Sequence, residues 1–220
     1  MSPVATTGGV SFPRGWRLTA CAAAAVCVTA ACLLAAYGAG EQGLSSIIRA
    51  TARTSFALFL PAFAAPALGV LRPARWTRWL CENRAHLFAA FAASHILHAA
   101  AIFTLARMTG GASLADRSTA IIAAGGLVYL PILFAGATAF APVAAWVRRR
   151  ARARFLLALG LYAVLFTFLD SYGGRVLEGR LFFLPFAALL VAALALDLLA
   201  APARRKSLRR DGVRADAPAA

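Results

Sequence analysis

Two histidines within one turn of an apolar segment are the residues of this 220-residue chain whose types and spacing could do chemistry. His95 and His98 lie in the stretch FAASHILHAA, so on a helix they share nearly one face. An ionisable side chain inside a membrane segment is costly, and it therefore marks a candidate functional site. Imidazole is a standard axial ligand of haem iron, and the small residues around the pair leave room for a flat group. Haem is the candidate ligand, with His95 and His98 as the candidate iron ligands.

Geometry restricts what this pair can hold. Two histidines on one helix face cannot ligate opposite faces of one haem, because the macrocycle must lie between the two rings. The third histidine of the chain, His86, lies on the same segment, so no other helix supplies an imidazole. One chain therefore offers at most one histidine per iron, unless two chains share a haem.

Two other interpretations of the pair remain. The imidazoles can hydrogen-bond carbonyls or hydroxyls of adjacent helices, with Ser94 and Thr104 as local candidates. A zinc site is disfavoured, because no carboxylate or cysteine lies at a suitable spacing.

The segments that must position the histidines are strongly apolar. Hydrophobic residues make up 61% of the chain and charged residues 14%, whereas a soluble domain has roughly half and a quarter. Blocks of about 20 apolar residues are long enough to cross a bilayer as helices. The sequence predicts an all-α polytopic membrane bundle, residues 16–201, with six transmembrane helices at about 16–37, 55–71, 86–106, 119–143, 155–172 and 181–201. Residues 1–15 and 202–220 are predicted to be disordered basic tails.

The net charge of +15 is distributed unevenly between the connecting segments. Of the 23 Lys and Arg residues, 17 lie in segments on the N-terminal side of the predicted membrane and 6 on the other. This bias predicts that both termini are cytoplasmic. We expect a multi-pass protein of a bacterial-type inner (cytoplasmic) membrane, surrounded by lipid, and no nucleic-acid partner.

Three stretches carry motifs in a fixed order, ATARTSFALFLPAFAAPAL at 50–68, RWLCENRAHLFAAFAASHILHAA at 78–100 and LGLYAVLFTFLDSYGGR at 159–175. Over residues 50–199 the chain resembles the ferric reductase-like transmembrane domain family, which includes haem-binding membrane subunits of bacterial sulfoxide reductase. The resemblance implies a haem b-binding bundle that transfers electrons, with His95 and His98 as ligands. A redox partner protein or a quinone, and a second copy of the chain, are the candidate partners.

The chain departs from the family at two positions. The family has a histidine just before Leu-Gly-Leu-Tyr, where this chain has about Leu157, and Phe88 stands where a small residue is usual. The missing fifth-helix imidazole is the cross-helix ligand that a six-coordinate haem needs. Arg53, at the outer end of the second helix, is a candidate partner of a haem propionate because arginine pairs with carboxylates bidentately; the alternative is an interface anchor.

Three functions therefore stay open. The first is a haem-binding electron-transfer protein with altered ligation. The second is a structural or partner-binding bundle without haem, and the third is a small transporter. The chain contains no P-loop sequence, and its one GxGxxG match, at 38–43, follows an apolar helical block rather than a strand, so no site for NAD, FAD or ATP is predicted and the chain is at most an electron-transfer subunit of an oxidoreductase.

Overall fold

The structure is a computed structural model, which describes residues 12–111, 123 and 125–215, with side chains as far as Arg204. The described residues form helices and connecting turns, without a strand. Within the described residues, five helices are long and apolar enough to cross a membrane, or six if one bent pair counts as a span. The prediction of an all-α membrane bundle is confirmed at this level. The elements are α1 (Trp16–Tyr37), α2 (Glu41–Leu71), α3 (Arg75–Met108), α6 (Tyr129–Ala137), α7 (Ala141–Arg149), α8 (Ala151–Leu177), the 3-10 helix η1 (Leu181–Phe183) and α9 (Leu184–Ala215).

Large apolar side chains lie on the outside of the bundle as well as inside it. Phe103, Phe155 and Leu198 are each more than 60% exposed. In water such exposure would be unfavourable, but hydrocarbon tails solvate these side chains well. The outer surface is therefore that of a protein in lipid.

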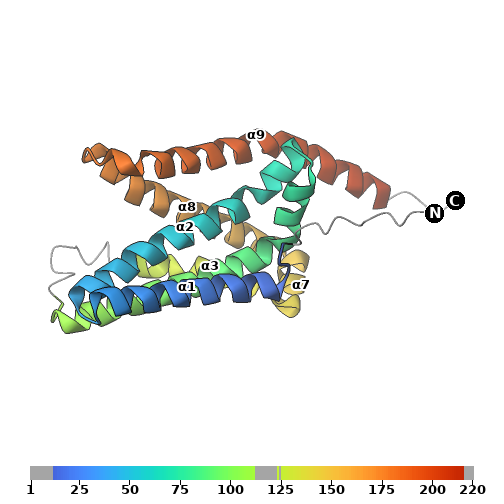
Figure 1. The fold of residues 1–220 in the computed structure, drawn as a ribbon. Helices are drawn as coiled ribbons and strands as arrows, with labels where there is room; N and C mark the ends of the chain where they lie inside the picture. The colour runs from blue at the N-terminus through green and yellow to red at the C-terminus, as the bar shows by residue number, and fades with distance from the viewer. Residues whose placement is uncertain (1–11, 112–122, 124, 216–220) are drawn as a thin grey trace, which may run out of the picture.

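Helices α2 and α3 share the largest interface of the bundle and run side by side (Figure 1). The close approach depends on small residues, as at Gly69, where an added Cβ would lie 2.9 Å from Sγ of Cys81. Farther along, Phe59 and Phe91 are fully buried, with ring centroids 5.3 Å apart. This interface fixes which face of α3 points into the bundle.

Glycines also set the contacts of α6. A Cβ added at Gly136 would lie 2.8 Å from the Cβ of Ala92 on α3. A Cβ added at Gly160 of α8 would overlap the side chain of Pro131. Helix α6 therefore packs between α3 and α8 because glycine stands at both crossing points.

The fourth predicted span, 119–143, is not straight in its described part. Helix α6 ends at Ala137, and the chain bends by 105° before it continues as α7. Pro142 lies in the first turn of α7 and lacks an N–H, so it cannot donate to the carbonyl of Thr138 and continue α6. The apolar composition of residues 119–143 identifies the hydrophobic block, but it carries no information about the bend. Residues 119–122 and 124 of the predicted span lie outside the described residues.

Several helices extend beyond the predicted apolar blocks. Helix α2 begins at Glu41 rather than near 55, and α3 begins at Arg75 rather than near 86. Helix α9 runs to Ala215, through residues for which the sequence predicted disorder. Hydropathy indicates which residues contact lipid, and it does not indicate where a helix ends. The helices continue past the apolar blocks because Ala, Leu, Arg and Lys are strong helix formers. Residues 1–11 and 216–220 of the predicted tails lie outside the described part.

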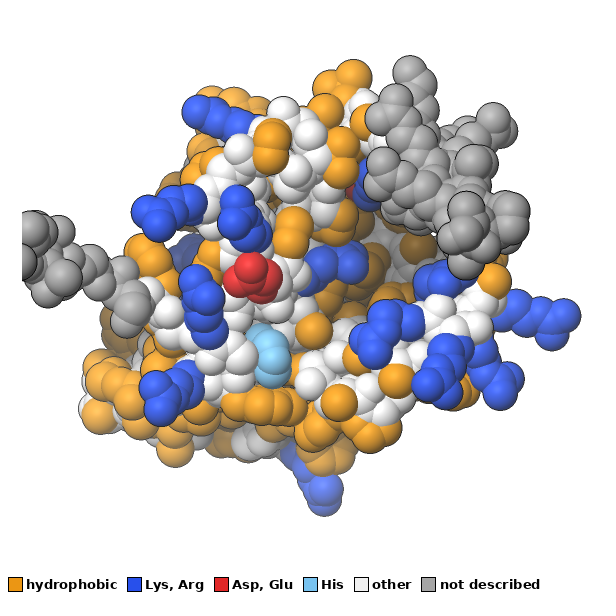
Figure 2. All heavy atoms as spheres, turned by 90° about the vertical axis from the view of Figure 1, so that its right-hand side faces the viewer, with side chains coloured by type: hydrophobic (Ala, Val, Ile, Leu, Met, Phe, Trp, Pro, Cys, Tyr) orange, Lys and Arg blue, Asp and Glu red, His pale blue; other side chains and the backbone are white. Residues whose placement is uncertain are grey.

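The start of α1, the α2–α3 turn, α7 and the second half of α9 lie at one end of the bundle, hereafter the basic end (Figure 1). The backbone N–H of Gly15 donates to Oδ1 of Asn83 at 2.8 Å, and the rings of Trp16 and Phe140 are 4.9 Å apart. Figure 2 shows Lys and Arg side chains gathered on this end, around a hollow in the surface. Among the described residues, the two sets of basic segments that the sequence distinguishes lie at opposite ends of the bundle.

Candidate functional site

His98 lies at the α2–α3 interface, and its ring is oriented by Thr51. Nδ1 of His98 is 2.9 Å from Oγ1 of Thr51. That hydroxyl donates its one proton to a carbonyl of its own helix, Ile47 O at 2.7 Å, so it accepts from the imidazole. The network therefore assigns the ring proton to Nδ1 and leaves the lone pair on Nε2. Metal-ligating histidines are commonly held in this way by a partner of the second ring nitrogen.

His95 has different surroundings, because aromatic rings enclose it. Its ring centroid lies 4.7 Å from that of Phe91, 5.5 Å from that of Tyr129 and 6.0 Å from that of Phe168. The ring of His98 is 5.6 Å away. Nδ1 of His95 is buried and has no hydrogen-bond partner among the described residues. Buried polar atoms without a partner are rare, so this atom lacks a structural explanation.

Polar side chains beside the histidines join α2 to α3. Ser55 donates to Ser94 at 2.9 Å, and Ser94 lies 3.3 Å from the carbonyl oxygen of Thr51. Ser94 thus contacts α2 rather than an imidazole, and Thr104 donates to Ala100 of its own helix. Sequence reasoning missed Thr51, which lies in the polar first part of α2, ahead of the apolar block at 55–71.

The residue of α8 in ring contact with His95 is Phe168, which the sequence analysis did not single out. The rings of Phe168 and His95 stand at 89°. Leu157, the position where the family has a histidine, packs against the hydrophobic core. It lies eleven residues from Phe168, about 16 Å along the helix. The two positions of α8 are thus at different depths, and Phe168 occupies the one beside His95.

Arg53 is not brought to the histidines. It follows Thr51 by two residues, which turns its side chain about 200° around the helix axis. Its guanidinium lies over the ring of Phe182 in η1, 5.4 Å from the centroid, on an exposed surface. This position favours an anchor at the end of the bundle opposite the basic end over a partner for a group bound beside His98.

Phe88 fills core space and supports Arg84. Its side chain is 2% exposed and lies beside Phe59. The guanidinium of Arg84 lies 5.1 Å above its ring centroid. The large side chain of Phe88 therefore fills the space between α2 and α3. It lies between the histidine pair and the basic end.

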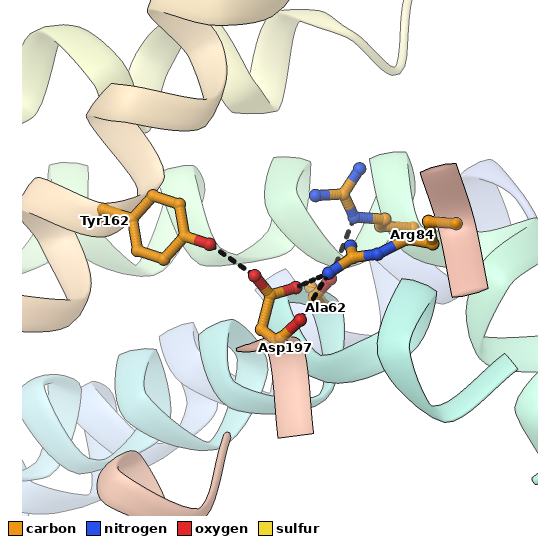
Figure 3. A network of polar contacts seen from close by, with 5 residues as sticks. Ala62, Arg84, Tyr162 and Asp197 are labelled. Atoms are coloured by element: carbon orange, nitrogen blue, oxygen red, sulfur yellow. Dashed lines mark hydrogen bonds and ion pairs between the residues drawn. The ribbon is translucent and has the colours of Figure 1, made fainter. Parts of the chain in front are cut away.

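A polar network joins α8 and α9 at the basic end (Figure 3). The hydroxyl of Tyr162 donates to Oδ2 of Asp197, and Nη2 of Arg204 lies 2.6 Å from Oδ1 of the same carboxylate. Arg204 also donates to the backbone carbonyl of Asp197 at 2.7 Å. Asp197 is therefore an arginine-paired acid.

By its chemistry, this donor set would allow a haem at most one histidine ligand per chain. His98 offers an oriented lone pair, and His95 offers a second imidazole on the same helix. No cluster of three or more His, Cys, Asp or Glu side chains occurs in the part of the chain that the structure describes. The geometry does not fit a ligand pair taken from two helices of one chain.

In comparisons with known proteins, no family model, no curated protein and no solved structure matches the chain. The family resemblance therefore depends on the three quoted stretches alone.

Proposed function

We infer that this multi-pass membrane protein binds haem b on the histidine face of α3 and transfers electrons to or from a partner. The observation that carries the proposal is the contact between His98 and Thr51. It leaves the lone pair of Nε2 available, which is the state an axial imidazole needs.

Haem b, when bound, supplies one-electron chemistry. The chain's own residues would hold the group and keep water away from it. His98 would provide the axial nitrogen, with its orientation set by Thr51, and the aromatic rings around His95 would provide an apolar wall. The candidate partners are a redox protein or a quinone, and a second copy of the chain would supply the further imidazole that one chain lacks.

The basic end is assigned to the cytoplasm, with both termini there. It carries the larger share of the Lys and Arg residues, which favour the cytoplasmic side of an inner membrane.

A bundle without haem is the alternative that a specific observation favours. The ring of Phe168 stands beside His95, at the place on α8 where a cross-helix imidazole would be useful. In that case the bond between His98 and Thr51 serves only to join α2 to α3, as polar side chains do in membrane bundles.

Histidine variants of the purified full-length protein separate the two functions. A haem-binding protein loses its reduced-minus-oxidised haem b spectrum in a His95→Ala, His98→Ala double variant. His86→Ala is the matched control, because His86 lies on the same helix near the basic end. An identical spectrum in the double variant would exclude the α3 pair as the ligand source.

A further inference from the structure

Arg84 donates a hydrogen bond to a backbone carbonyl of α2 that has no helical N–H partner, because a proline stands four residues after it. Pro66 of α2 has no N–H, so it cannot donate to the carbonyl oxygen of Ala62 four residues earlier. Nε of Arg84, on α3, donates to that oxygen at 3.0 Å. The ring of Phe88 supports the guanidinium from below. The position of the guanidinium is therefore fixed by both helices.

This fixed guanidinium has unused donors and an uncompensated charge. Among the described side chains, Arg84 forms no ion pair and its two Nη groups have no hydrogen-bond partner. They are not among the fully buried atoms, so they keep some exposed surface. The nearby carboxylate of Asp197 is already used by Arg204 and Tyr162 (Figure 3). A cation this close to the membrane interior gains from an anionic partner.

The sequence places Arg84 near the expected level of the lipid phosphates. The predicted apolar part of α3 begins near His86, which places Arg84 just outside the hydrocarbon. Basic side chains also surround the hollow at this end of the bundle (Figure 2). Anionic lipids of the cytoplasmic leaflet are attracted to such basic segments.

We propose that the two Nη groups of Arg84 bind the phosphate of an anionic phospholipid at the basic end. Arginine suits this ligand because its planar fork donates two parallel hydrogen bonds to phosphate oxygens. The hydrogen bond to Ala62 and the ring of Phe88 orient the fork before the lipid arrives. The site is separate from the histidine face, and it does not depend on haem.

Thermal unfolding of the full-length protein in detergent, titrated with phosphatidylglycerol, tests the site. Phosphatidylglycerol should raise the melting temperature more than phosphatidylcholine does. Arg84→Gln should weaken the apparent affinity for phosphatidylglycerol by about tenfold or more, because it removes charge-assisted hydrogen bonds. Arg78→Gln, at an exposed arginine of the same end, is the control and should bind like the wild type.

Inorganic phosphate distinguishes a lipid site from a site for a free anion. If millimolar phosphate reproduces the stabilisation in an Arg84-dependent way, the phosphoryl group alone is recognised and the lipid assignment is overturned. If Arg84→Gln does not fold, Arg84→Lys replaces it, and it should still bind phosphatidylglycerol more weakly because a lysine has no planar fork. An undiminished response in the variant that folds, or no lipid effect on the wild type, would also overturn the proposal.

Discussion

Nδ1 of His98 on α3 lies 2.9 Å from Oγ1 of Thr51 on α2, within hydrogen-bond distance. Thr51 is 3% exposed, and its own proton is used on the carbonyl of Ile47. The contact therefore joins the two helices and fixes the imidazole tautomer at once. It is the feature of the site that both a haem-binding and a structural role would need.

Thr51→Val should destabilise the bundle by about 1 kcal/mol, because it removes the hydrogen bond between Nδ1 of His98 and the threonine hydroxyl. In the haem-bound protein it should also lower haem retention, since the ring loses its orienting partner. Thr54→Val is the matched control, because the Thr54 hydroxyl bonds only the carbonyl of Ala50 in its own helix. Chemical unfolding in detergent and haem content per chain measure the two effects. Equal results for the two variants would refute the role of Thr51.

Gly160→Ala should be destabilising by about 1–3 kcal/mol, because the new methyl group overlaps Pro131 where α8 meets α6. Gly173→Ala in the same helix has no atom within 4 Å of the added Cβ. It should be neutral or stabilising by up to about 1 kcal/mol, since alanine favours helix more than glycine does. Comparison of the two unfolding midpoints checks the packing of α6 against α8, and a tolerated Gly160→Ala would show that the two helices are not in close contact.

Phe168→His and Leu157→His compare the two positions of α8 at which a cross-helix imidazole could be supplied. Phe168 contacts the ring of His95, whereas Leu157 lies about 16 Å away along the helix. We therefore expect Phe168→His to raise the haem recovered per chain and Leu157→His to leave it unchanged. The opposite order would mean that the family's ligand position, and not the Phe168 position, faces the haem.

Asp197→Asn should cost about 1–3 kcal/mol, because it weakens the hydrogen bonds of Arg204 and Tyr162 to a carboxylate that is only 13% exposed. Glu82→Gln is the comparison, since Glu82 pairs with Arg14 at 3.8 Å on the surface. Exposed pairs of this kind contribute roughly 0–1 kcal/mol. Urea or detergent titration of both variants measures the difference, and equal destabilisation would contradict a special role for the α8–α9 network.

The apolar block at 16–37 coincides with helix α1, so in this case hydropathy predicted both helix ends. It did not predict the ends of α2, α3 and α9, because helices continue past the membrane on residues that form helix in water. The bend before α7 depends on one proline and a short turn. A hydropathy average over many residues is not sensitive to either.

The candidate site was only half predictable. His95 and His98 stand out because imidazoles are rare in apolar helices. Thr51 and Phe168 do not stand out, since threonine and phenylalanine are ordinary in such helices. Both residues matter because they contact the histidines from other helices. Such contacts cannot be predicted from the spacing of residues within α3.

The central claim is that the histidine face of α3 binds haem b, and the most direct test is the optical spectrum of the wild-type protein. It should be purified from cells supplied with haem, then fully oxidised and fully reduced. The account predicts a reduced-minus-oxidised haem b spectrum. A colourless protein without a haem band would contradict it and leave a structural membrane bundle.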